Sequence, residues 1–181
     1  HKNKGSTEMK PLIAITIGDP AGIGPEIVLR ALNNKEVYTE IRPLVIGNVK
    51  FLERVSDVVK NKAAFNIVSS PEEGKYEFGT VDVLNIDNAE PEEIPYGVIS
   101  AKAGAAAYDY IKKSIELGIE KKIDGVATAP IQKEAIHMAG IPYIGHTEMY
   151  QEITNSPNAL TMFHVDNMRI FFLTRHLSLI N

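Results

Sequence analysis

Short apolar runs alternate with amphipathic stretches along the chain, and this alternation predicts the fold class. Four runs have the length and apolar character of buried strands; they lie at residues 12–17, 43–47, 81–86 and 123–127. Stretches with the apolar spacing of helices separate most of them. This repeated order of strand, helix and strand favours an α/β fold with a largely parallel sheet.

Three amphipathic helices are predicted at residues 26–33, 49–59 and 100–120. The apolar side chains on their inward faces are expected to be buried; they are Ile27, Leu29 and Leu32, then Phe51, Leu52, Val55, Val58 and Val59, and finally Ala103, Ala107, Ile111, Ile115 and Leu117. The small residues at 103–107 permit a close approach to a neighbouring backbone.

The acidic, proline-containing stretch at residues 87–95 is the best candidate for a linker. It divides the chain into a first α/β domain at 10–95 and a second at 96–181, after a leader or tag remnant at 1–9. Its carboxylates suit a solvated surface loop better than a metal site. Apolar Leu177, Leu179 and Ile180 follow the last predicted strand, so we expect the second domain to be truncated here.

Composition excludes several classes of function. The net charge of −4 and the lack of a basic cluster argue against nucleic-acid binding. Because the chain has no cysteine, disulfides, thiolate catalysis and Cys-ligated metals are excluded. No apolar run is long enough to cross a membrane, and we expect a cytoplasmic protein.

A glycine-rich turn, GDPAGIG at residues 18–24, links the first strand to the first helix. Backbone N–H groups and the helix dipole at such a turn form a possible anion cradle. The spacing matches neither of the common nucleotide-binding glycine motifs, and a tight strand-to-helix connection is the alternative.

Polar residues of interest follow the strand at 123–127, where ligands of α/β sheets gather beyond the carboxyl ends of strands. Lys133 opens a predicted helix there, with a solvated surface lysine as the alternative interpretation. Gly145, His146 and Thr147 combine close backbone approach with hydrogen-bonding side chains. Glu148 suits the N-terminal turn of the next helix.

His176 follows a predicted strand at 168–174 and so also lies at a carboxyl end. A catalytic metal usually has about three protein ligands, and no partner for His176 is evident in its sequence neighbourhood.

Four ordered motifs resemble those of the 4-hydroxythreonine-4-phosphate dehydrogenase family of pyridoxal phosphate biosynthesis. They are GDPAGIGPE at 18–26, TAPIQK at 128–133, AGIPYIGHTE at 139–148 and TRHLSL at 174–179. The resemblance implies a two-domain α/β/α fold similar to isocitrate and isopropylmalate dehydrogenases, in a homodimer. It also implies oxidation of 4-phosphohydroxy-L-threonine with NAD or NADP, followed by decarboxylation to 3-amino-2-oxopropyl phosphate.

The resemblance assigns roles to individual residues. His146 and Thr147 correspond to substrate-binding positions, and His176 to a ligand of a divalent metal (Zn, Mg or Co). Lys133 lies where the family keeps a lysine, which we expect to act in proton transfer or phosphate binding. Asp19 and Gly22 are expected on the cofactor side.

Further metal ligands and most cofactor contacts of the family lie beyond Asn181, so we expect the 181-residue piece alone to be inactive. Two other functions stay open. One is a paralogous dehydrogenase of threonate or erythronate 4-phosphate, and the other is a non-catalytic module that binds a phosphorylated ligand.

Overall fold

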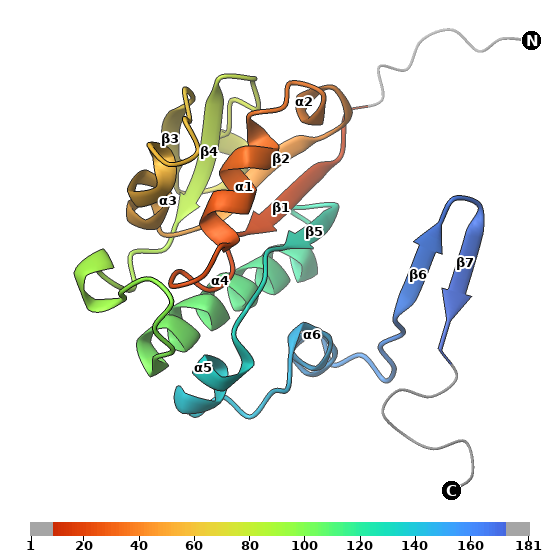
Figure 1. Cartoon of the computed structure of the whole chain (residues 1–181). Helices are drawn as coiled ribbons and strands as arrows, with labels where there is room; N and C mark the ends of the chain where they lie inside the picture. Colours follow the sequence, from red (N-terminus) through yellow and green to blue (C-terminus); the bar gives the residue numbers. More distant parts are fainter. Residues whose placement is uncertain (1–8, 173–181) are drawn as a thin grey trace, which may run out of the picture.

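A five-stranded parallel sheet forms the centre of the computed structural model, which describes residues 9–172 (Figure 1). The strand order is β3-β4-β2-β1-β5, and every neighbouring pair is parallel. The strands are β1 (Leu12–Thr16), β2 (Arg42–Gly47), β3 (Ala64–Val68), β4 (Thr80–Asn85) and β5 (Gly125–Thr128). The predicted α/β class and the four predicted strands are confirmed.

Strand β3 was not predicted from the sequence. It lies at the edge of the sheet and pairs only with β4. Four of its five residues are exposed or half-buried, and only Val68 is fully buried. An edge strand of this kind lacks the continuous apolar run that marks a strand covered on both faces.

Helices cover the two faces of the sheet. Helices α1 (Gly24–Leu32) and α3 (Val49–Ser56) pack against each other, whereas α4 (Ala101–Ile119) packs against β1, β2 and β5. Strand β2 lies on one side of β1 and β5 on the other. Right-handed crossovers that run in opposite directions along a sheet place their helices on opposite faces. Short helical segments complete this part: α2 (Val37–Glu40) and the 3₁₀ turns η1 (Pro71–Glu73) and η2 (Pro91–Glu93).

Two residues that we expected in the core are exposed. Ile27 is 41% exposed because the buried side of α1 follows residues 24, 25, 28, 29 and 32. Val58 is 63% exposed because α3 ends at Ser56, so the helical spacing no longer applies to it. The predicted inward face of α4 is confirmed, since Ala103, Ala107, Ile111, Ile115 and Leu117 are all buried.

Helices α5 (Lys133–Met138) and α6 (His146–Ile153) pack against α4 on the side away from the sheet. Buried side chains of α4, α5 and α6 together form a small second core: Ala107, Ile111, Ile115, Ile136 and Met149. Gly104 lets α5 come close, because a Cβ at Gly104 would lie 2.0 Å from the Ala135 carbonyl oxygen. This contact fixes the helix that begins with Lys133.

An antiparallel hairpin of β6 (Met162–Val165) and β7 (Met168–Phe171) follows α6 and stands away from the sheet in Figure 1. All residues of both strands are exposed. The expected domain division at residue 95 stays a proposal; within the described residues, α4 and β5 come after that boundary and still belong to the first sheet and its core. Among residues 9–172, no helix has the length and apolar character needed to cross a membrane.

Gly104→Ala should destabilise the fold by about 2 kcal/mol or more, because the added methyl group overpacks the contact with α5. Gly118→Ala is the matched control on the same helix, since nothing lies within 4 Å of its Cβ position. This control should be neutral or stabilise by about 0.5–1 kcal/mol. Urea denaturation of both variants measures the difference, and equal effects would contradict close α4–α5 packing.

Candidate functional site

The carboxyl ends of β1 and β5 form the edge at which the candidate site lies. The strand order reverses at β1, and ligands of open α/β sheets bind at such switch points. The chain after β1 and the chain after β5 are in direct contact here. The Asp19 amide donates to the Pro130 carbonyl oxygen at 2.9 Å.

Gly18 makes this contact possible. Its φ is +70°, a left-handed conformation that favours glycine, and a Cβ would lie 2.2 Å from the Pro130 oxygen. The GDPAG turn and the Ala129–Pro130 segment therefore approach each other through backbone atoms. Residues of this junction line two pockets, which contain most of the residues selected from the sequence.

The first pocket, here called the α6 pocket, has a volume of about 380 Å³. Its lining includes Lys133, Gly145, His146, Thr147 and Glu148. The structure thus brings together the three residues predicted at 133, 146 and 147. It also confirms Glu148 in the first turn of a helix.

Helix starts position these side chains. Lys133 is the first residue of α5, where the Gln132 side chain caps the helix by accepting from the Glu134 amide. Helix α6 begins at His146 after Gly145, which provides no side-chain cap. The first N–H groups of a helix without a side-chain cap are available to acceptors, and the helix dipole favours negative charge at that end. Lys133 is exposed and adds a positive charge to the same pocket.

His146 lies in a partly buried part of the α6 pocket. Burial lowers the pKa of its imidazole below the ordinary value of 6.5. Its Nε2 atom is buried and has no hydrogen-bond partner among the described residues. A neutral imidazole can donate one hydrogen bond and accept another, which suits contact with a hydroxyl or phosphoryl oxygen.

The second pocket, here called the glycine-turn pocket, is smaller, at about 110 Å³. It is lined by residues of three separate segments: Asp19, Ala21, Gly22, Gly97, Val98, Ile99 and Gln132. Asp19 is only 5% exposed, and its Oδ1 accepts from the Ala21 amide at 2.7 Å. Burial raises the pKa of the Asp19 carboxyl, and the bond from Ala21 opposes that rise. A pocket of this size accommodates one small group and not a whole dinucleotide.

The glycine-rich turn is a tight connection more than an anion cradle. The amide of Asp19 is bound to Pro130, that of Ala21 to the Asp19 side chain, and that of Gly22 to the Asp19 carbonyl. Gly24 is also tightly placed, with its Cβ position 2.0 Å from the Ile17 oxygen. Of the two interpretations of this turn, the structure favours the second.

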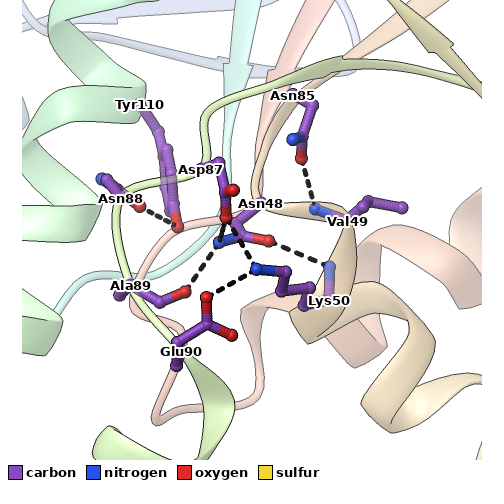
Figure 2. Close-up of polar contacts among 9 residues, drawn as sticks. All are labelled: Asn48, Val49, Lys50, Asn85, Asp87, Asn88, Ala89, Glu90 and Tyr110. Carbon is purple, nitrogen blue, oxygen red and sulfur yellow. Dashed lines mark hydrogen bonds and ion pairs between the residues drawn. The ribbon is translucent and has the colours of Figure 1, made fainter.

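The acidic stretch at 87–95 is anchored to α3 through a polar network (Figure 2). Lys50 donates to Asp87 at 3.0 Å and to Glu90 at 2.6 Å. Asn48, which is fully buried, donates to the Ala89 carbonyl and accepts from the Lys50 amide. The carboxylates of Asp87 and Glu90 are thus paired with Lys50, which agrees with a surface loop and not with a metal site.

The expected metal ligand His176 lies outside the described residues. Among residues 9–172, no group of three His, Cys, Asp or Glu side chains comes together in a way that suits a metal ion. The part of the chain that the structure describes therefore offers no donor set with which to test the metal.

Sequence patterns did not identify Gly97, which lines the glycine-turn pocket, or Arg54, which donates a hydrogen bond to the Pro20 carbonyl of the GDPAG turn. Gly97 lies in the loop before α4, and its amide donates to the Ala21 carbonyl at 2.8 Å. Arg54 lies in the last turn of the amphipathic helix α3, where an arginine ordinarily indicates only a solvated face. Neither residue belongs to a recognisable spacing.

The His146 signal in an NMR pH titration should give a pKa below 6.5 in the folded protein. Because the unfolded chain takes up this proton at higher pH than the folded one, the contribution of His146 to stability should fall as the pH drops through 6.5. His146→Gln identifies the resonance. A pKa at or above 6.5 would contradict the buried, uncharged environment.

Comparison with known proteins identifies the family of this chain. The family model described as "Pyridoxal phosphate biosynthetic protein PdxA" matches residues 39–181. A "Putative D-threonate 4-phosphate dehydrogenase" from Halalkalibacterium halodurans is 49% identical over 170 residues, which are 94% of this chain and 51% of the relative. A protein of the same name from Symbiobacterium thermophilum is 49% identical over 172 residues, 95% of this chain and 51% of its own length.

A solved structure agrees with the fold. The crystal structure of a 4-hydroxythreonine-4-phosphate dehydrogenase from Burkholderia phymatum superposes with a TM-score of 0.89 at 40% identity. The match covers 94% of this chain and 52% of that one, so the chain spans about half the length of the proteins it resembles. The motifs, the parallel sheet and the family match agree, and the chain belongs to the pyridoxal phosphate biosynthetic protein PdxA family.

Proposed function

We propose that the protein expressed from its complete gene is an NAD(P)-dependent dehydrogenase of a four-carbon hydroxy acid 4-phosphate. The observation that carries this proposal is the α6 pocket, which gathers Lys133, His146 and Thr147 beside an uncapped helix start. Positive charge and N–H donors suit a phosphorylated substrate, and a neutral imidazole suits its hydroxyl groups. The names of the relatives agree with this chemistry.

The reaction has two steps. With NAD or NADP bound, the cofactor would supply the hydride acceptor for oxidation of the secondary alcohol at C3. A base would take the hydroxyl proton, and the product would be a ketone β to the carboxylate. Carbon dioxide then departs, and the electron pair of the broken C–C bond forms an enolate that takes up a proton. From 4-phosphohydroxy-L-threonine the product is 3-amino-2-oxopropyl phosphate; from threonate 4-phosphate it is dihydroxyacetone phosphate.

In this proposal, His146 and Thr147 bind the substrate through their side chains. Lys133 either holds the phosphate or takes part in proton transfer, and its place in the lining of the α6 pocket permits both roles. Binding in a fixed orientation beside the cofactor is the main contribution of these residues to rate.

We assign the glycine-turn pocket to the nicotinamide end of NAD or NADP. The buried Asp19 carboxylate would repel the pyrophosphate, whereas the oxidised nicotinamide ring is a cation that a carboxylate attracts. The pocket volume of about 110 Å³ suits one ring-sized group. Asp19 and Gly22 are the residues of the turn that line it.

A divalent metal (Zn, Mg or Co) belongs to the proposal through His176, which lies outside the described residues. Such an ion would polarise the developing carbonyl group. A homodimer and a cytoplasmic location are proposed from the resemblance alone.

The substrate can be identified by comparing turnover of two compounds by the complete protein. D-Threonate 4-phosphate is the favoured substrate, because the two relatives at 49% identity carry that name. We expect its kcat/KM to exceed that of 4-phosphohydroxy-L-threonine by about tenfold or more, which corresponds to one well-placed polar contact. A preference for 4-phosphohydroxy-L-threonine would assign the protein to the pyridoxine pathway. If the protein turns over neither compound, the proposal is contradicted.

Asp19→Asn tests the cofactor assignment, because asparagine keeps an oxygen that accepts from the Ala21 amide but removes the charge. The Kd of NAD⁺ should rise by roughly fivefold, whereas that of NADH, whose ring is neutral, should change by less than about twofold. Fluorescence titration at pH 8 measures both. Equal changes for the two forms would place the nicotinamide ring away from Asp19.

A further inference from the structure

Two loops that are far apart in the sequence form most of the lining of the glycine-turn pocket. One is the GDPAG turn after β1, and the other is the segment 91–99 before α4. The Gly97 amide donates to the Ala21 carbonyl at 2.8 Å, and this is the backbone hydrogen bond that joins them directly.

The Arg54 side chain of α3 donates hydrogen bonds to both of these loops. One terminal nitrogen donates to the Pro20 carbonyl at 2.6 Å. The other donates to the carbonyls of Ile94, at 2.7 Å, and Pro91, at 3.2 Å. A single guanidinium therefore spans both loops.

Aromatic rings fix the plane of this guanidinium. Its central carbon lies 3.9 Å from the centroid of the Tyr96 ring and 4.9 Å from that of Phe51. A cation over the face of an aromatic ring is attracted by the ring quadrupole. The Arg54 side chain is thus held by contacts on its faces and by hydrogen bonds at its edge.

All the oxygen atoms that accept from Arg54 are main-chain carbonyls. No ion pair between Arg54 and a carboxylate occurs within residues 9–172. Because the acceptors are uncharged and lie on two loops, we infer that the planar geometry of the guanidinium group matters more here than its charge. Only a planar group with several donors can reach Pro20 and Ile94 at once.

We propose that Arg54 is a positioning residue for the dinucleotide site. It sets the distance between the GDPAG turn and the segment 91–99, and so the shape of the glycine-turn pocket. Arg54 lines neither this pocket nor the α6 pocket and acts through Pro20 and Ile94. The assignment rests on the proposed cofactor site. The clamp between the loops is a separate claim that can be measured without cofactor.

Lys50 provides a matched control. It lies one helical turn before Arg54 on α3 and holds the same linker through Asp87 and Glu90 (Figure 2). Within residues 9–172, the side-chain hydrogen bonds and ion pairs of Lys50 go to Asp87 and Glu90, and not to the GDPAG turn. Lys50→Met therefore loosens the linker near residues 87–90 and leaves the turn in place.

The first experiment is hydrogen–deuterium exchange of the complete protein without ligands. Arg54→Met and Arg54→Lys should both speed exchange in peptides covering 18–24 and 94–99, by about tenfold, because each loses bonds from a charged donor to both loops. Lys50→Met should leave 18–24 unchanged. Wild-type exchange of 18–24 in both Arg54 variants would overturn the clamp.

The second experiment separates cofactor from substrate. In Arg54→Lys, the KM for the dinucleotide should rise by about tenfold, while the KM for the phosphorylated substrate should stay within about twofold, since that substrate is assigned to the α6 pocket. Equal increases in both KM values, or a wild-type cofactor KM, would overturn the positioning role. If the wild-type protein binds no dinucleotide, the proposed function fails, and the exchange experiment alone decides whether Arg54 clamps the loops.

Discussion

A backbone contact between Gly18 and Pro130 determines how the rest of the site is built. A left-handed glycine after β1 brings the Asp19 amide to 2.9 Å from the Pro130 oxygen, where any larger residue would collide with that oxygen. The loops after two neighbouring parallel strands are thereby joined at the switch point of the sheet. Both candidate pockets lie beside this junction, so one contact between backbones fixes their relative placement.

The two pockets differ in their charged groups, and we propose different ligands for them. The α6 pocket combines Lys133 and Glu148 with the start of α6, and in the proposal it holds the phosphorylated acid. In the glycine-turn pocket, the buried carboxylate of Asp19 suits a cationic or neutral ring. Pro130 and Ile131 line the first pocket and Gln132 the second, so a short segment after β5 separates the two assigned ligands. Hydride transfer needs this kind of close but distinct placement.

The sequence predicts the elements with a strong periodic signal. The buried strands and the inward face of α4 follow directly from apolar spacing, and the motif residues at 133, 146 and 147 do lie in one pocket. Edge strand β3 was missed because a half-exposed strand has no continuous apolar run. Ile27 and Val58 were placed wrongly because the rotation and the end of a helix depend on its tertiary neighbours.

Arg54 shows a different limit of sequence reasoning. Its partners are carbonyl groups of Pro20, Pro91 and Ile94, and a backbone acceptor leaves no trace in the identity of a residue. Of the two alternatives for the GDPAG turn, the tight connection is favoured for a related reason, because the amides of Asp19, Ala21 and Gly22 are bound within the turn and to Pro130. Residue types indicate which groups are present, whereas their pairing depends on the fold.

The most direct test of the two proposed ligand sites is a crystal structure of the complete protein with NAD⁺ and D-threonate 4-phosphate bound together. We expect the nicotinamide ring between Asp19, Gly22 and Gly97, and the phosphorylated acid beside Lys133, His146 and Thr147. The segment 130–132 should lie between the two ligands. A nicotinamide ring in the α6 pocket, or a substrate that contacts neither His146 nor Thr147, would contradict the two proposed sites.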